Sequence, residues 1–164
     1  MGERADDAVI RPLGQPGDLG WVVMAHGQQY AREFGWDASF EGLVARIVAD
    51  YAAADSDRQA AWIAEVGGRR AGCVFCTAES SRTAQLRILL VTSEGRGLGL
   101  GRSLVRRCVD FARDAGYRRM TLWTNDVLST ARRIYENEGF ELVDQEPHRS
   151  FGHDLVGQNW AREL

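Results

Sequence analysis

The chain contains no lysine, and all 20 of its basic residues are arginine. Cysteine and proline are also scarce, with three residues each. No uninterrupted apolar run approaches the ~18 residues that a membrane-spanning helix needs. The first residues lack the apolar core of a signal peptide. We therefore expect no disulfide framework, no membrane partner and a soluble, cytoplasmic protein.

The charge balance argues against a nucleic-acid partner. The formal net charge is −3, whereas proteins that bind nucleic acid through its phosphates are usually basic. Apolar residues make up 45% of the chain and charged residues 26%, as in ordinary globular proteins. The length of 164 residues fits a single domain, residues 1–164.

Two of the cysteines have the spacing of a redox or zinc motif. Cys73 and Cys76 lie in an expected strand, where a spacing of three residues sends side chains to opposite faces. Neither a second such pair nor a nearby histidine completes a metal site. Cys108 falls on the buried face of an expected helix. We predict three buried thiols and no metal.

The hydrophobic pattern predicts an α/β domain of the order β-α-α-β-β-β-α-β-α-β-β. We expect strands over residues 9–13, 59–66, 70–79, 84–91, 117–124, 140–146 and 153–162, and helices that start near Asp18 and near Asp37 or Ser39 and that span 100–115 and 126–138. Asp18 is a candidate cap for the first helix. Gly67-Gly68 predicts a tight hairpin turn. The strands form one mixed sheet with helices on both faces, and a parallel pair flanks the helix that begins at residue 100.

A glycine-rich stretch, Arg96-Gly97-Leu98-Gly99-Leu100-Gly101, joins an expected strand to that helix. Exposed amides and the positive end of the helix dipole favour an anion there. The stretch fits neither a Walker A loop nor a dinucleotide fingerprint, because the required glycines and lysine are missing. A nucleotide-binding protein is therefore disfavoured. An ordinary glycine turn without a ligand stays an alternative.

Two motifs in this order resemble the GNAT superfamily of N-acetyltransferases. The first is the acyl-CoA signature Arg/Gln-x-x-Gly-x-Gly/Ala, met by Arg96, Gly99 and Gly101. The second is the downstream series Asn125, Ala131, Tyr135, Gly139 and Phe140. The resemblance implies a GNAT-like mixed sheet of about seven strands. It also implies an acetyl-CoA-dependent N-acetyltransferase that transfers acetyl directly to an amine of a small molecule or a protein.

The resemblance also implies which residues bind acetyl-CoA and which one is catalytic. The cofactor-binding candidates are Leu89, Leu90, Val91, Arg96, Gly97, Leu98, Gly99, Leu100, Gly101, Arg102, Ser103 and Asn125. The strand through Leu89–Val91 is expected to splay from 117–124, so that pantetheine pairs with its backbone. Leu98 departs from the basic or polar residue common in relatives, and Arg96, Arg102, Arg132 or Arg133 are the candidate phosphate contacts. Asn125 alternatively caps the next helix.

Tyr135 is the implied acid that protonates the departing CoA thiolate; the alternative is a core aromatic. No general base is evident, because the strand before the glycine loop carries no carboxylate. Candidate substitutes are His26, Glu33, Glu79, His148 and His153. A non-catalytic acyl-CoA-binding regulatory module on the same fold is therefore the alternative function.

The C-terminal half carries a narrower resemblance. Residues 122–126 and 146–155 resemble the acetyltransferase domains fused to MarR-type DNA-binding regulators. The length leaves no room for such a regulator, so we expect the free-standing form. Exposed final strands in such sheets often pair between subunits, so a homodimer is one of the oligomeric states that the sequence leaves open.

Overall fold

The computed structural model describes residues 7–164. Its elements are β1 (Ala8–Pro12), α1 (Asp18–Phe34), α2 (Ala38–Ala53), β2 (Ala60–Val66), β3 (Arg69–Ala78), β4 (Thr83–Val91), the 3₁₀ turn η2 (Ser93–Gly95), α3 (Leu100–Asp114), β5 (Arg119–Asn125), α4 (Ser129–Asn137), β6 (Glu141–Ser150) and β7 (His153–Glu163). This order confirms the predicted α/β fold class. No helix within the described residues has the length and apolar character to cross a bilayer.

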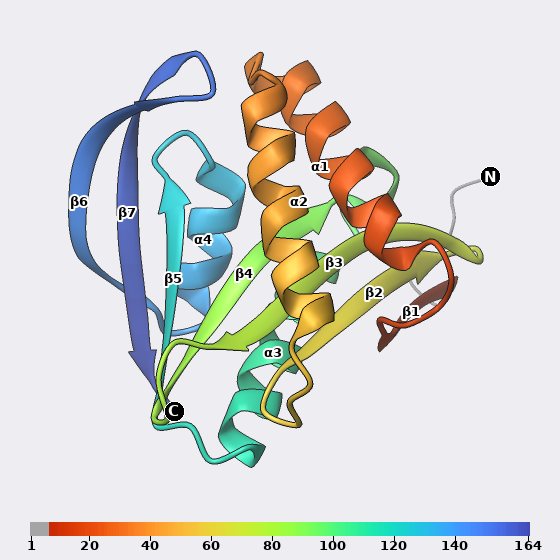
Figure 1. Ribbon diagram of the computed structural model, residues 1–164, viewed down its shortest axis with the longest axis vertical. Coiled ribbons are helices and arrows are strands. Elements are labelled where there is room, and N and C mark those ends of the chain that lie inside the picture. Colours follow the sequence, from red (N-terminus) through yellow and green to blue (C-terminus); the bar gives the residue numbers. More distant parts are fainter. Residues whose placement is uncertain (1–6) are drawn as a thin grey trace.

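One seven-stranded sheet forms the centre of the molecule, in the order β1-β2-β3-β4-β5-β7-β6. All neighbours are antiparallel except β4 and β5, which flank α3 as expected. Figure 1 shows α1 and α2 together over one face, with α3 behind the sheet. The hairpin at Gly67 and Gly68 is also confirmed, since both residues have positive φ, 57° and 78°.

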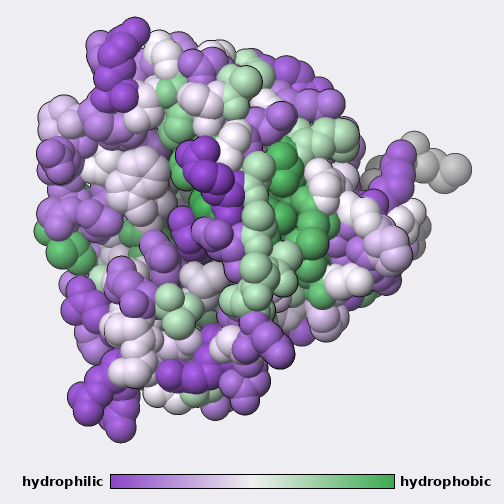
Figure 2. Space-filling model, viewed as in Figure 1, coloured by the Kyte–Doolittle hydropathy of each residue, from purple (hydrophilic) through white to green (hydrophobic). Residues whose placement is uncertain are grey.

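Each face of the sheet buries its own apolar cluster. The cluster under α1 and α2 contains Val22, Val44 and Phe75, and the opposite cluster contains Leu104 and Met120. Apolar side chains also gather over the centre of the outer surface of the α1–α2 pair, with polar ones around them (Figure 2).

The cysteines follow the strand geometry. Cys73 belongs to the cluster under α1 and α2, while Cys76 and Cys108 belong to the cluster on the opposite face. All three are buried free thiols, which confirms the prediction. Burial raises the pKa of the Cys108 thiol well above its usual value.

Three helix starts test the sequence predictions. Asp37 caps α2, and its carboxylate accepts the amide of Ser39 at 2.9 Å. Asp18 does not cap α1: the cap position is Gly17, and Asp18 is the first helical residue. Helix α4 begins at Ser129 rather than at residue 126, with Leu128 in the cap position and no side-chain cap. The alternative of Asn125 as that helix's cap is therefore wrong.

Strands β4 and β5 pair over only three positions, from Thr83 with Arg119 to Gln85 with Thr121, and then diverge. Beyond this point β4 contains an irregularity. Its register against β3 shifts opposite Cys73–Phe75, and Ile88 has a positive φ of 44°. Leu86 and Leu89 both pack against the α3 side, although they are three residues apart. An irregularity of this kind is a β-bulge, which bends a strand away from its neighbour.

The start of α1 is held by a buried carboxylate. Asp18 is 1% exposed and accepts hydrogen bonds from Arg11 and Arg70 and from the amides of Gly14 and Gln15, all at 2.8–2.9 Å. The hydrogen bonds from Arg11, together with those of the two amides and Arg70, hold the pKa of Asp18 well below its usual range despite the burial. Instead of capping its own helix, Asp18 ties the preceding loop and β3 to the first turn of α1.

We expect Asp18→Asn to lower the free energy of unfolding by about 3 kcal/mol at pH 7, because two guanidinium groups lose a buried partner. The folded-state pKa is depressed, so this stabilisation is complete above the unfolded pKa of about 4 and is lost as the pH falls below it. Urea denaturation at pH 7 and pH 3 measures both values. The wild-type advantage should shrink at pH 3.

The control is Asp154→Asn, which breaks a pair with Arg149 whose side chains are 67% and 86% exposed. We expect a change below about 0.5 kcal/mol. Equal losses in the two variants would contradict a special role for Asp18.

Candidate active site

A groove of about 580 Å³ runs from the glycine-rich loop along the diverging end of β4. It is bounded by β4, the loop and α3 on one side, by α4 on another and by α1 on a third. The lining residues are Gln29, Tyr30, Glu33, Phe34, Leu89, Leu90, Val91, Gly95, Arg96, Gly97, Gly99, Leu100, Gly101, Arg102, Val127, Leu128, Ser129, Thr130, Ala131 and Ile134. Three of the predicted cofactor residues do not line it, namely Leu98, Ser103 and Asn125.

The loop presents unpaired backbone amides to the groove. Gly97 and Gly99 have positive φ, 81° and 72°, and a Cβ on either would meet nothing within 4 Å. Their freedom of φ, not a lack of space, explains why glycine stands there. The amide of Ser103 is bonded to the carbonyl of Gly99 at 3.1 Å, whereas the amides of residues 97–102 have no acceptor within residues 7–164. These amides and the helix dipole form a cradle for an anion.

Two contacts connect α1 to this part of the groove. The Nε2 of Gln29 donates to the carbonyl of Val91 at 2.9 Å, which fixes the last residue of β4. Arg96 forms an ion pair with Glu33, so its guanidinium is turned toward α1. Both side chains of that pair are partly exposed, and their attraction contributes little to stability.

The other candidate phosphate contacts are Arg102, Arg132 and Arg133, and they differ in the partners and the exposure of their side chains. Arg102 is paired with Glu138 at 2.8 Å on the outer side of α3. Arg132 donates to the carbonyl of Asp126 at 2.9 Å, while Arg133 is exposed on α4. Of the four arginines, Arg96 and Arg102 line the groove.

A second cavity of about 400 Å³ lies deeper, between α1, α2, α4 and the diverging strands. It is lined by His26, Tyr30, Trp36, Phe40, Leu43, Val44, Ile47, Gln85, Leu86, Arg87, Ile88, Leu89, Trp123, Thr124, Asn125, Leu128, Ala131 and Tyr135. Tyr30, Leu89, Leu128 and Ala131 line both spaces, so the groove and this inner cavity adjoin one another. A ligand in the groove can therefore present one end to a molecule in the cavity.

Tyr135 lines the inner cavity, although it also belongs to the core. It is 5% exposed and packs against Phe140 with ring centroids 5.9 Å apart. Its hydroxyl makes no hydrogen bond to any described residue. Burial raises the pKa of Tyr135 far above its usual value, so the hydroxyl keeps its proton at neutral pH. The two sequence interpretations, a core aromatic and a proton donor, are compatible in this position.

Asn125 ends β5 at the wall of the inner cavity and is 2% exposed. Its Oδ1 accepts a hydrogen bond from Nε2 of His148 at 2.7 Å, and Nδ1 of the same ring lies 2.9 Å from the hydroxyl of Ser150. Since Oδ1 can only accept, Nε2 carries the proton. The Nδ2 donor of Asn125 has no partner among the described residues.

His26 is the one candidate base that lines the inner cavity. It is 1% exposed, and Nδ1 donates to the carbonyl of Val22 at 2.7 Å. Nε2 is buried and has no hydrogen-bond partner within residues 7–164. Burial lowers the pKa of His26 to about 4. The ring is therefore neutral at pH 7, and Nε2 offers a lone pair but is a weak base.

The other candidate bases lie elsewhere. His148 is held by Asn125, Nε2 of His153 lies 3.0 Å from the carbonyl of Gly35, and Glu33 faces Arg96 across the groove. Glu79 follows the end of β3 and lines neither space. The described residues bring no carboxylate to the inner cavity and gather no set of three metal-ligating side chains.

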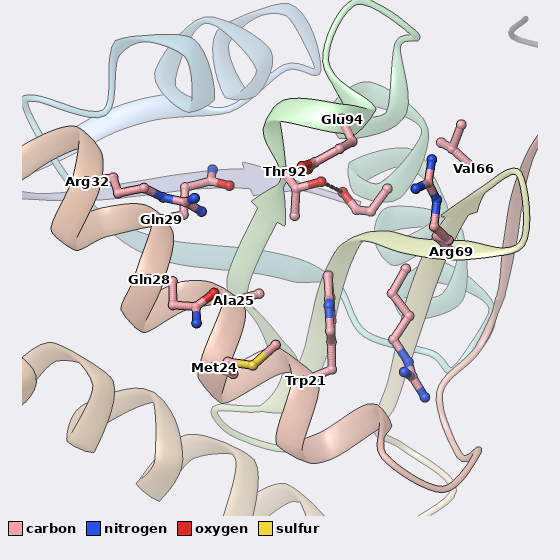
Figure 3. A pocket seen from close by; sticks show the side chains of 12 residues that line it. Trp21, Met24, Ala25, Gln28, Gln29, Arg32, Val66, Arg69, Thr92 and Glu94 are labelled. Atoms are coloured by element: carbon pink, nitrogen blue, oxygen red, sulfur yellow. Dashed lines mark hydrogen bonds between the residues drawn. The ribbon is translucent and has the colours of Figure 1, made fainter. Parts of the chain in front are cut away.

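A further hollow of about 330 Å³ lies beside α1, between that helix and the ends of β3 and β4. Figure 3 shows its lining, with Trp21, Met24 and Arg32 from α1 opposite Arg69 and Glu94. It shares Gln29 with the groove, but it contains none of the predicted site residues. It is distinct from the candidate active site.

Two site features were not predicted from the sequence, namely the contact of Gln29 with Val91 and the position of Arg87 in the inner cavity. Neither has a local motif. The sequence signal for Arg87 is its place on the strand before the glycine loop, which carries no carboxylate.

Known proteins support the assignment that this geometry suggests. The pattern of the acetyltransferase (GNAT) family matches residues 24–140, so the chain belongs to that family. N-acetyltransferase family 8 member 2 of Rattus norvegicus is 35% identical over 85 residues, which cover 49% of this chain and 38% of that protein. N-acetylaspartate synthetase of Danio rerio is 34% identical over 85 residues, covering 51% and 30% respectively. The chain thus spans less than half the length of either relative.

A solved structure shows the same fold. YncA from Salmonella typhimurium, described as an acetyltransferase with its cofactor acetyl-CoA, superposes with a TM-score of 0.78. The match covers 96% of this chain and 94% of that one, at 20% sequence identity. At this identity the likeness establishes the GNAT fold.

We expect His26 to titrate near pH 4 in the folded protein, as its lowered pKa indicates. The unfolded side chain takes up its proton near pH 6.5, so the folded state loses stability as the pH falls through this window. The loss should be about 2 kcal/mol between pH 7 and pH 5, since one pKa unit corresponds to 1.36 kcal/mol. His26→Asn should remove this part of the pH dependence.

The measurements are an NMR titration of the His26 ring and urea denaturation of both proteins at the two pH values. A His26 midpoint near 6.5 would show that the ring is open to water and would restore it as a base candidate.

Proposed function

We propose that this protein is an acetyl-CoA-dependent N-acetyltransferase that transfers acetyl directly to an amine of a small molecule or a protein. The supporting observation is the junction of two spaces: a groove with unpaired amides at one end, and an inner cavity lined by Tyr135. Acetyl-CoA has the matching shape, with a pyrophosphate remote from its reactive thioester. Family membership supports the same conclusion.

In this proposal the amides of residues 97–102 bind the pyrophosphate, and the exposed edge of Leu89, Leu90 and Val91 binds pantetheine. Because β5 leaves β4 after Gln85, no strand of the described part of the chain pairs with that edge. Unpaired backbone groups of this kind accept an extended ligand as a substitute strand. Asn125 and Ser103 do not line the groove and would act on acetyl-CoA only indirectly, whereas Leu98 contributes its backbone amide alone.

The transfer requires one bond to form and one to break. The amine nitrogen attacks the acetyl carbon, the carbon–sulfur bond breaks, the sulfur takes one proton, and the nitrogen releases one as the amide forms, so that the donor of the sulfur's proton is reprotonated. Tyr135 is the proposed donor of that proton, because its hydroxyl is protonated and makes no hydrogen bond to any described residue. The amine must arrive neutral, since the described residues that line the cavity include no carboxylate. The acceptor therefore loses its ammonium proton to water before it enters the inner cavity.

The absence of a carboxylate base from the described cavity lining also favours a second candidate function, a non-catalytic acyl-CoA-binding regulatory module. Thiol release on addition of amines separates the two. The cytoplasmic location, the homodimer and the resemblance to MarR-fused acetyltransferase domains stay predictions.

Acetyl-CoA should raise the melting temperature of the wild-type protein, whereas ATP and NAD should not. We expect Gly99→Ala to weaken acetyl-CoA binding at least about 10-fold, because a residue with Cβ resists the positive φ that aims the loop amides. Gly116→Ala is the matched control, since Gly116 has a φ of 92°, open space around it and a place far from the groove.

Both variants should lose about 1–2 kcal/mol of stability from the strained backbone, but only Gly99→Ala should lose affinity in isothermal titration calorimetry. Stabilisation by ATP or NAD alone, or equal affinity in both variants, would contradict the pyrophosphate site.

We expect Tyr135→Phe to lower kcat roughly 100-fold, the usual contribution of a positioned proton donor. The acetyl-CoA Kd should stay nearly unchanged, because Tyr135 lies outside the groove. Thiol release measures turnover and calorimetry measures affinity. Tyr51→Phe, a substitution on α2 outside both spaces, is the control. Unchanged turnover in Tyr135→Phe would remove this residue from the mechanism.

A further inference from the structure

The inner cavity contains a cation that the acetyl transfer does not use. Arg87 lies on β4 among a mostly apolar lining and is half-buried. It forms no hydrogen bond or ion pair with any described residue. Asp50 on α2 is the carboxylate that acts on it through space, without a contact within ion-pair distance. A guanidinium with this degree of burial and no partner is costly, and such a cost usually marks a place for a ligand.

The bulge of β4 explains how an arginine comes to face this cavity. Leu86 and Leu89 both pack on the α3 side of the sheet, so the two residues between them are left for the other face. Ile88 takes the positive φ of 44° that this requires and packs under α1 and α2. Arg87 thus lines the cavity two residues before Leu89, where the cavity meets the groove.

The rest of the lining is complementary to an apolar group. Tyr30, Trp36 and Phe40 form a ring cluster, with centroids 4.7 Å apart for Tyr30–Phe40 and 4.9 Å for Trp36–Phe40. The other ionisable groups of the lining are neutral at pH 7, because burial lowers the pKa of His26 to about 4 and raises the pKa values of Tyr30 and Tyr135. The cavity therefore has a single positive charge and an aromatic wall.

We infer that the acceptor is an amino acid with an apolar or aromatic side chain, whose carboxylate binds Arg87 and whose amine faces the thioester at Leu89. This assignment rests on the proposed acetyltransferase function. A guanidinium binds a carboxylate with two parallel hydrogen bonds. Arg87 lies two residues from Leu89, so one small molecule with neighbouring amine and carboxylate groups can face both. A cavity of about 400 Å³ lies within the size range of small-molecule sites.

The test compares amino acids with the amines that lack their carboxylate: phenylalanine with phenethylamine, tryptophan with tryptamine and leucine with isoamylamine. Thiol release gives kcat/KM for each in the wild type and in Arg87→Gln. We expect Arg87→Gln to lower kcat/KM for the amino acids roughly 10- to 100-fold through KM, as the loss of hydrogen bonds to a charged group predicts. The values for the matched amines should change by less than about 3-fold. Comparing each pair across the two proteins cancels the different basicities of the amines.

Arg46→Gln is the control, because Arg46 is an exposed arginine of α2 outside the cavity and its loss changes the net charge equally. Arg87→Lys should restore part of the selectivity, since it keeps the charge without the two-pronged geometry. Acetyl-CoA affinity, measured by calorimetry, should be equal in all four proteins and reports that each is folded.

The outcomes separate this inference from the proposed function. Turnover of amines with the same selectivity in wild type and Arg87→Gln overturns the role of Arg87 and leaves the acetyltransferase proposal intact. If the protein binds acetyl-CoA but none of these amines causes release of the CoA thiol, both the role of Arg87 and the acetyltransferase proposal are overturned. That result favours the regulatory module.

Discussion

The separation of β5 from β4 is the constraint on which both parts of the candidate site depend. The two strands are paired for three positions only, and the bulge at Arg87–Ile88 then bends β4 away. A continuous parallel pair would occupy the backbone of Leu89–Val91 and would close the space between the strands. Because the pair opens, one edge of β4 is left for an extended ligand and the space beside it becomes the inner cavity. The bulge removes some strand pairing and thereby creates two binding surfaces, the open edge of β4 and the inner cavity.

Helix α1 keeps this opening in a defined shape. Its first turn is fixed by Asp18, which binds the preceding loop and two arginines, and its later turns bring Gln29 and Glu33 to the groove. Gln29 holds the carbonyl of Val91, the last residue of β4, and only the short turn that contains η2 separates Val91 from the loop that presents the amides. The buried ion pairs at one end of α1 and the amide contact at the other thus connect the stability of the fold to the geometry of the loop.

Most of the fold was predictable from the sequence because its signals are local. The element order, the hairpin at Gly67-Gly68 and the cap at Asp37 each follow from a few neighbouring residues. Asp18 was misassigned as a cap because an aspartate before a helix has the same local signal whether it binds forward or backward. Its choice is made by Arg11 and Arg70, and Arg70 is 52 positions away in the chain. The loop residues were found by spacing, whereas Arg87 and Gln29 act through contacts that no spacing reports.

The charge distribution of the site explains why the donor was easier to predict than the acceptor. Backbone amides bind the pyrophosphate, and they depend on glycines whose positions are visible in the sequence. The acceptor is bound by side chains from α1, α2, β4, β5 and α4, which meet only in the fold. A missing carboxylate on β4 first suggested a lost catalytic function. In the structure Arg87 lines the cavity near that position, so the described lining has a cation and no carboxylate. A cavity of this charge attracts an anionic group. An acceptor amine that carries its own carboxylate supplies that group.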